Sequence, residues 1–175
     1  MKLLRLLKAF FIGFICLFIV ITIFSLIIPS NIKVSRVTVI NNVTPGRVYA
    51  QIANLQNWKN WHPVFKSDSA IVTFTDSGRR SCDIVYSGST THLSITSLDP
   101  GAIKFDLRSG NENPIHVEMH LTGLPDQKSV QVEWRALTRL HWYPWEKFYG
   151  IFIDKLSGPG YEAALKGLKD FLELK

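Results

Sequence analysis

The sequence predicts an α+β fold, in which a curved antiparallel sheet of about seven strands packs around a long C-terminal helix and is preceded by one transmembrane helix. Three observations lead to this prediction. Residues 9–28 form an uncharged apolar run, residues 70–137 alternate with a period of two between regular turns, and residues 161–172 carry an apolar stripe at helical spacing. Because 175 residues suit one domain with a short extension, we expect an anchor over residues 1–29 and a single domain over residues 30–175.

The N-terminal apolar run has the length and composition of a membrane-spanning helix. Fifteen of the twenty residues from Ala9 to Ile28 are Leu, Ile, Val or Phe. At ~1.5 Å per residue, twenty helical residues span roughly 30 Å, the thickness of a bilayer's hydrocarbon core. A core helix would carry a polar stripe, and a cleaved signal peptide would have a shorter apolar stretch and a small-x-small cleavage site. The run has no polar stripe and offers only a poor cleavage site around Ser25, so we expect an uncleaved anchor.

The charge distribution predicts the orientation of this anchor. The net charge of +6 divides equally between residues 1–28, which hold Lys2, Arg5 and Lys8 and no acidic residue, and the rest of the chain. The positive-inside rule therefore predicts a single pass through the cell (inner) membrane, with the N-terminus cytoplasmic and the domain extracytoplasmic. A domain that is only mildly basic lacks the charge footprint of a nucleic-acid-binding protein, so we expect no nucleic-acid partner.

A strand and short helical segments are expected after the anchor. Residues 33–41 are rich in β-branched side chains and predict the first strand. The Thr-Pro pair at residues 44–45 is typical of a helix start with a capping hydroxyl, and apolar residues recur at helical spacing over residues 48–55. The segment 58–63 contains Trp58 and Trp61 on a second short turn that its proline ends, and we expect both tryptophans in the core.

Six further strands are expected between residues 70 and 137. Turn residues interrupt the alternating pattern every eight to twelve positions, which is typical of an antiparallel meander. Alternation places Phe105 and Met119 on an apolar face, and Lys104 and Glu118 on a wet face. The predicted turns are Asp76-Ser77-Gly78, Ser87-Gly88-Ser89, Asp99-Pro100-Gly101, Ser109-Gly110-Asn111 and Pro125-Asp126.

The C-terminal part predicts two helices. Residues 144–156 are helical in composition, and the Ser-Gly-Pro-Gly sequence at residues 157–160 is expected to interrupt the helix before a longer one begins. The apolar stripe of the longer helix consists of Tyr161, Leu165, Leu168 and Leu172. This stripe supplies a cover for the apolar face of the sheet and completes a layered domain.

Two segments resemble a known superfamily. Residues 52–63 read Ile-Ala-Asn-Leu-Gln-Asn-Trp-Lys-Asn-Trp-His-Pro, and the tail at residues 148–156 reads Phe-Tyr-Gly-Ile-Phe-Ile-Asp-Lys-Leu, with Gly158-Pro159 following. Both are similar to the START-like, or SRPBCC, superfamily, in the small bacterial polyketide cyclase/dehydrase-like branch that carries an N-terminal membrane helix. The resemblance covers about residues 33–173. It implies the helix-grip fold with a cavity for apolar ligands between the sheet and the last helix, and it implies no shared catalytic set.

The candidate ligand-binding residues are those that alternation or the helical stripe turns toward this cavity. They are Phe105, Leu107, Met119, Val132, Trp134, Phe152, Leu165 and Leu168. These positions show no acid–base pair, so we expect no catalytic residues and no cofactor. The expected function is the binding of a hydrophobic or amphipathic small molecule, such as a lipid or a polyketide-like compound, by a membrane-anchored domain.

Two other features are compatible with different chemistry. His116, Glu118 and His120 share one face of a strand and could converge on zinc, but the alternate residues of that strand are apolar and face inward, so we expect a solvated sheet face and no metal site. Cys82 lies in the middle of a strand, where we expect a buried thiol rather than a nucleophile. The sequence contains neither a Gly-x-Ser-x-Gly hydrolase motif nor a phosphate-binding glycine-rich loop.

Aromatic residues crowd the segment 142–152 around Pro144, namely Trp142, Tyr143, Trp145, Phe148, Tyr149 and Phe152. Two interpretations stay open. The aromatic side chains pack at the base of the sheet, or they form a cavity mouth with Trp and Tyr at the headgroup level of the membrane. Arg139 near His141 is compatible with a mouth that holds an anionic head group.

Two alternative functions also stay open. A cyclase- or dehydratase-type enzyme would use a cavity His or Asp as a general base, and its pKa would be shifted by burial. A tethered protein-interaction module would have a filled core and an exposed apolar patch. The sequence predicts the bilayer, through residues 9–28, and an apolar small molecule as partners, and it identifies no protein partner.

Overall fold

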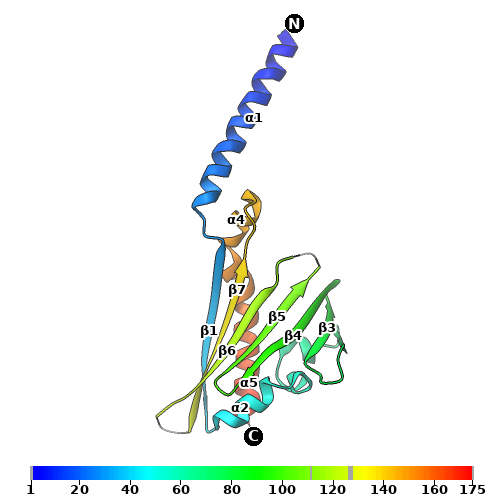
Figure 1. Cartoon of the computed structure of the whole chain (residues 1–175), viewed down its shortest axis with the longest axis vertical. Coiled ribbons are helices and arrows are strands. Elements are labelled where there is room, and N and C mark those ends of the chain that lie inside the picture. Colours follow the sequence, from blue (N-terminus) through cyan, green and yellow to red (C-terminus); the bar gives the residue numbers. More distant parts are fainter. Residues whose placement is uncertain (1, 111, 126–127, 175) are drawn as a thin grey trace.

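The computed structural model describes residues 2–110, 112–125 and 128–174, and its architecture confirms the predicted α+β, helix-grip-like fold (Figure 1). Within these residues one seven-stranded antiparallel sheet has the order β1-β7-β6-β5-β4-β3-β2. The long C-terminal helix lies against one face of this sheet. The strands are β1 (Asn31–Asn41), β2 (Ile71–Phe74), β3 (Ser81–Tyr86), β4 (Ser89–Asp99), β5 (Ala102–Ser109), β6 (Ile115–Gly123) and β7 (Ser129–Arg139).

The strands lie where the alternating pattern predicts them. Every neighbouring pair is antiparallel. The edge strand β1 pairs with β7 along its whole length, from Asn31 opposite Arg139 to Asn41 opposite Ser129. Of the predicted turns, Asn111 and Asp126 lie outside the described residues. The alternation therefore sets which side chains face the helix, because each strand keeps one face toward it.

Helix α1 (Lys2–Ile27) projects away from the domain (Figure 1). Residues Arg5–Ile27 form one helix that is long and apolar enough to cross a membrane. Most of its described apolar side chains are exposed, for example Phe10 by 71% and Ile27 by 75%. The helix is therefore not a covered core helix of the domain.

Three short helices connect β1 to β2. They are α2 (Pro45–Ile52), the 3-10 helix η1 (Leu55–Asn60) and α3 (Pro63–Lys66). Two details differ from the prediction. The Thr44 side chain makes no capping hydrogen bond although Thr44 stands at the N-cap, and Pro63 begins α3 instead of only ending a turn. A proline at the first helical position needs no backbone donor and has the backbone φ of a helix, so it starts α3 without cost.

Trp58 and Trp61 hold this connection to the domain, as predicted. Both are 1% exposed. The indole N–H of Trp58 donates to the Ile52 carbonyl at 2.9 Å, and that of Trp61 donates to the Gln51 carbonyl at 3.3 Å. A Cβ at Gly167 of the C-terminal helix would lie 2.2 Å from the Trp61 carbonyl oxygen, so the close approach of the two segments requires glycine there.

The predicted break in the C-terminal helices is wrong in position. Helix α4 (Pro144–Gly150) ends before Ile151 and Phe152, and α5 (Ile153–Glu173) then continues through Ser157-Gly158-Pro159-Gly160 without interruption. A proline inside a helix loses one backbone hydrogen bond and crowds the preceding turn, and glycine lowers helix propensity, which is why the local sequence predicts a break. Contacts with β1 keep the helix continuous.

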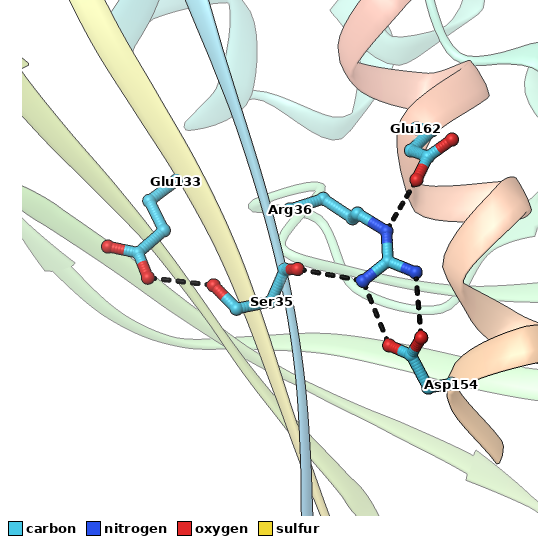
Figure 2. A network of polar contacts seen from close by, with 5 residues as sticks. All are labelled: Ser35, Arg36, Glu133, Asp154 and Glu162. Carbon is cyan, nitrogen blue, oxygen red and sulfur yellow. Dashed lines mark hydrogen bonds and ion pairs between the residues drawn. The ribbon is translucent and has the colours of Figure 1, made fainter.

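Arg36 of β1 makes the contacts that join both sides of the Gly158-Pro159 pair (Figure 2). Its guanidinium donates to Asp154 at 2.8 Å and to Glu162 at 2.6 Å. The two carboxylates lie before and after the pair on α5, and the hydrogen bonds with them raise the pKa of Arg36. A Cβ at residue 158 would lie 2.1 Å from Nη2 of Arg36, so glycine makes room for the guanidinium.

Candidate ligand-binding cavity

An apolar cavity of about 360 Å³ lies between the inner face of the sheet and the part of α5 around Gly160 and Tyr161. Its walls come from strands β3, β4, β5 and β7, from the connection that carries Trp58 and His62, and from Gly160 and Tyr161 of α5. Tyr86, Ser89 and Gly160 are exposed lining residues and mark its mouth. The full lining is Trp58, His62, Val64, Phe65, Ile84, Tyr86, Ser89, Thr91, Leu93, Phe105, Leu107, Trp134, Gly160 and Tyr161.

Aromatic contacts build the inner end of this cavity. The Trp134 ring stacks on Tyr161, with centroids 5.2 Å apart, and meets the edge of Phe105 at 5.6 Å. Trp58 meets Phe105 at 5.3 Å in a similar edge-on arrangement. Such pairs are favourable beyond the area that they bury and fix the orientation of each ring. The wall is therefore shaped by side chains from β5, β7, η1 and α5.

Two buried polar atoms among these rings have no hydrogen-bond partner in the described parts of the chain. They are Nδ1 of His62 and Nε1 of Trp134, and the two rings lie 6.2 Å apart. An unsatisfied buried polar group costs about 1–3 kcal/mol. The cavity therefore combines apolar walls with an indole donor and a histidine nitrogen that the protein itself does not satisfy.

Burial lowers the pKa of His62 to about 4. The imidazole lies against aromatic rings, with centroid distances from 5.2 to 6.2 Å to Trp58, Trp61, Phe65 and Trp134. Because this environment disfavours the imidazolium, the side chain is neutral near pH 7. A neutral imidazole carries one donor and one acceptor, so it can bind a hydroxyl or a carbonyl.

The eight candidate residues named from the sequence occupy three different places. Phe105, Leu107 and Trp134 line the cavity. Met119, Val132, Leu165 and Leu168 are buried in the core cluster beside it. Phe152 is 53% exposed at the start of α5, away from the cavity. Phe152 lies in the two-residue gap between α4 and α5, before the apolar stripe begins at Tyr161, and it is not among the lining residues of the cavity.

Sequence reasoning did not select His62, Thr91 or Trp58 as lining residues. His62 follows Trp58 by four positions and Trp61 by one, but its place in the cavity depends on how the 58–65 segment folds against the sheet. Thr91 follows the inward alternation of β4, since it pairs with buried Ile84 and precedes buried Leu93 by two. That alternation was the available signal for Thr91, and none of comparable strength existed for His62.

The His116–Glu118–His120 group lies on the outer face, as alternation predicts. His116 lies 2.7 Å from Asp106, and His120 lies 3.0 Å from Glu118 and 3.1 Å from Arg135. Burial raises the pKa of Glu118, but His120 and Lys104 outweigh it and hold that pKa below its usual value. The described residues contain no group of three or more His, Cys, Asp or Glu side chains arranged to hold a metal ion.

The two remaining candidate residues, Cys82 and His141, lie outside the cavity and have contacts of their own. Cys82 is fully buried on β3, and burial, with Asp83 and Asp76 nearby, raises the pKa of its thiol to about 12. Such a thiol is not ionised near neutral pH, which supports the predicted role as a small buried side chain. His141 bonds Glu146 at 2.9 Å, at the N-terminal end of α4.

A model of the family described as polyketide cyclase / dehydrase and lipid transport matches residues 31–173. The match covers all seven strands and α5, and it omits the apolar helix α1. A search of curated proteins found no significant match.

Several solved structures share this fold. A START superfamily protein from Mycobacterium smegmatis is 14% identical, with a TM-score of 0.61 over 82% of this chain and 98% of that one. XoxI from Bacillus cereus is 15% identical, with a TM-score of 0.58 over 81% and 95%. The Aha1 dimer from Colwellia psychrerythraea is 13% identical, with a TM-score of 0.56 over 81% and 96%. At these identities the likeness concerns the fold alone.

Proposed function

Because the chain belongs to the polyketide cyclase / dehydrase and lipid transport family, we propose that its domain binds a small hydrophobic or amphipathic molecule in the cavity between the sheet and α5. The observation that carries the proposal is the cavity itself, with its aromatic walls and its mouth between the β3–β4 hairpin and Gly160. Pockets of this kind, mostly apolar with a few polar groups, are the usual sites for small ligands.

The cavity size limits the ligand. A volume of about 360 Å³ is near the lower end of the roughly 300–1,000 Å³ found for small-molecule sites. It accommodates a single chain or a compact ring system, and a diacyl lipid would have to leave part of itself outside the mouth. We therefore infer a single-chain lipid or a small polyketide-like compound.

The unsatisfied polar atoms suggest that the ligand carries oxygen. The Trp134 indole N–H is a donor only, and a carbonyl or hydroxyl oxygen beside it would relieve the cost of its burial. His62 offers a second polar contact among the same rings. Orientation of the ligand would then depend on this pair, while affinity would come from the apolar walls.

We further propose that α1 anchors the domain in the cell (inner) membrane as a single pass, with the N-terminus in the cytoplasm and the domain outside. The length and hydropathy of Arg5–Ile27 support the span, and Lys2, Arg5 and Lys8 on its N-terminal side support the orientation. In this arrangement the domain handles an apolar compound at the outer surface of that membrane.

Thr91→Trp tests the cavity directly. The indole would occupy the cavity that Thr91 lines, and tryptophan is well tolerated in strands. Thr90→Trp is the matched control, since residue 90 is exposed on the opposite face of β4. The full chain is purified in detergent and analysed by native mass spectrometry and solvent extraction. We expect near-unit stoichiometry of a small molecule in the wild type and in Thr90→Trp, and loss in Thr91→Trp.

Two outcomes would contradict the binding proposal. One is an empty wild-type chain that also takes up no added single-chain fatty acid. The other is a folded Thr91→Trp variant that retains the small molecule at wild-type stoichiometry, which would locate the molecule elsewhere on the protein.

His62 lies in the cavity, so a second candidate function is a cyclase- or dehydratase-type enzyme that uses this histidine as its general base. A pKa of about 4 makes His62 a weak base at neutral pH, since effective general bases have pKa values near the working pH. The described lining residues include no carboxylate to pair with it. These two observations favour binding over catalysis.

A further inference from the structure

A group of exposed apolar side chains lies on α4, just before it and at the start of α5. We call it the α4 surface, and it is made by large side chains that are between 53% and 65% exposed. They are Trp142, Trp145, Tyr149, Ile151, Phe152 and Leu156. Contiguous exposed apolar surfaces of this kind usually mark an interaction site rather than ordinary solvent-facing structure.

The α4 surface lies where the apolar N-terminal helix ends (Figure 1). The Lys147 ammonium of α4 donates to the Ile28 carbonyl at 2.8 Å and to the Ser30 hydroxyl at 2.6 Å. The backbone N–H of Leu140 donates to the Ser30 carbonyl at 2.7 Å. Since residues 28–30 alone separate α1 from β1, these bonds hold α4 close to the last turn of α1.

Most of the charged side chains of this segment are paired within the protein. Lys147 is 4% exposed and bound to the end of α1. Glu146 bonds His141, and Asp154 bonds Arg36. Lys155 is the remaining charged residue between 142 and 156, and it is exposed. The outward chemistry of this segment is therefore mainly aromatic and aliphatic, with an exposed cation at Lys155 and an exposed but paired carboxylate at Asp154.

This chemistry fits the interfacial region of a bilayer. Trp and Tyr are enriched at the headgroup level, where an apolar ring and a polar N–H or O–H are both accommodated. Tyr143 and Trp145 stack with an interplanar angle of 2° and centroids 5.1 Å apart, which gives the surface a flat aromatic element. A lysine beside such rings suits anionic headgroups.

We propose that the α4 surface lies in the headgroup region of the same bilayer that α1 crosses, and so holds the domain in a fixed orientation against the membrane. The inference rests on the membrane anchoring proposed above. The bonds between Lys147 and the residues just after the span argue for lipid as the occupant, because they keep the α4 surface at the depth where the span ends. A protein partner is the alternative that the test excludes.

This arrangement would place a groove, separate from the ligand cavity, next to the bilayer. A groove of about 660 Å³ lies beside the α4 surface, with Tyr143, Trp145 and Tyr149 among its lining and Ser157 of α5 at its far side. Ser157 stands one helical turn before Tyr161, which lines the ligand cavity. The groove and the cavity are therefore lined one helical turn apart on α5, so a molecule that left the bilayer at the α4 surface would meet the groove first.

Tryptophan fluorescence tests the proposal because of where the five tryptophans lie. Trp58, Trp61 and Trp134 are buried in the domain, α1 contains none, and Trp142 and Trp145 belong to the α4 surface. The full chain is reconstituted into phosphatidylcholine vesicles with and without brominated acyl chains, which quench nearby indoles. We expect brominated lipid to reduce the emission of the wild type and to leave the W142F/W145F variant unquenched.

The outcomes separate the two proposals. Vesicle flotation reports first whether the chain is held by the membrane, and failure to float would contradict the anchoring itself. A chain that floats but shows equal emission in both lipids, with Trp142 and Trp145 open to aqueous iodide, would overturn the α4 proposal alone and leave that surface to a protein partner. Quenching that persists in W142F/W145F would overturn it too, since it would come from the other three tryptophans.

Discussion

Histidines lie on both sides of the sheet, but in opposite surroundings. On the outer face, His116 lies 2.7 Å from Asp106, and His120 contacts Glu118 and Arg135. Beneath the inner face, Nδ1 of His62 and Nε1 of Trp134 are buried, and the described residues give them no partner. The outer group is conspicuous in the sequence because three residues with metal-ligating side chains share one strand face, whereas His62 and Trp134 lie far apart in the chain.

The comparison shows that a ligand site is indicated by polar atoms that lack hydrogen-bond partners within the protein, and not by the residue types alone. On the outer face the charges satisfy one another in contact with water, so little free energy remains for a ligand to gain. In the cavity a polar atom left unsatisfied by the fold gains a hydrogen bond when a ligand arrives. The following predictions test whether the two faces differ in this way.

The largest expected difference concerns stability. Phe105 is fully buried against Trp58 and Trp134, so Phe105→Ala should lower the free energy of unfolding by about 3–5 kcal/mol. His116→Ala on the outer face removes a half-exposed pair and should cost under about 1 kcal/mol. Urea unfolding of both variants measures this. Equal losses would show that the outer network supports the fold as strongly as the core does.

The next largest effect is the loss of folding stability at low pH that His62 causes. The folded pKa of His62 is about 4, below the usual 6.5, so between these values the unfolded chain takes up a proton that the folded chain refuses. With respect to His62, the free energy of unfolding is highest above about pH 6.5 and decreases as the pH falls toward 4. At about 1.4 kcal/mol per pKa unit the loss amounts to roughly 3 kcal/mol.

His62→Phe keeps an aromatic ring in place and removes the titration. Unfolding measured at pH 7 and pH 4.5 should therefore show a smaller acid loss in His62→Phe than in the wild type. His116→Asn, on the outer face, serves as the control and should retain most of the wild-type loss. An unchanged acid loss in His62→Phe would mean that His62 titrates in the folded protein as it does in water.

The smallest effect arises on the outer face at lower pH, because water screens an ion pair there and reduces what its pKa shift contributes to stability. Arg135 and Ser35 bond the Glu133 carboxylate and lower its pKa from 4.5 to about 2 (Figure 2 shows the Ser35 contact). Its contribution to stability is present above about pH 4.5 and is lost as the pH falls toward 2. Glu133→Gln should therefore flatten the stability profile between these values and leave the loss between pH 6.5 and 4.5 intact. A profile unchanged by Glu133→Gln would contradict this assignment.

Most of the fold could be predicted from the sequence because the signals are local. Alternation and turn residues define the strands between residues 70 and 137, and the same alternation separates Phe105 from Lys104. The helix break could not be located in this way. Gly158 and Pro159 weaken α5 locally, and a single residue of β1, Arg36, holds the two sides together from more than a hundred positions away.

The cavity was less predictable than the fold. Leu107 and Trp134 follow from alternation, since it states which face a strand residue takes. His62 lies in a short connection without a periodic pattern, and its position depends on the packing of Trp58 and Trp61 and on the close approach of Gly167. Alternation also cannot distinguish a residue that lines a cavity, such as Phe105, from one that fills the core, such as Met119.

The most direct test of the central claim is to map where an apolar probe binds. A fatty acid with a photoreactive diazirine is added to the full chain in vesicles, irradiated, and located by peptide mass spectrometry. The account predicts labelling in the peptides that contain residues 58–65 and 84–93, and its loss in Thr91→Trp. Labelling confined to α1, or found on the outer face around Lys104 and His116, would contradict the claim that the inner cavity holds the ligand.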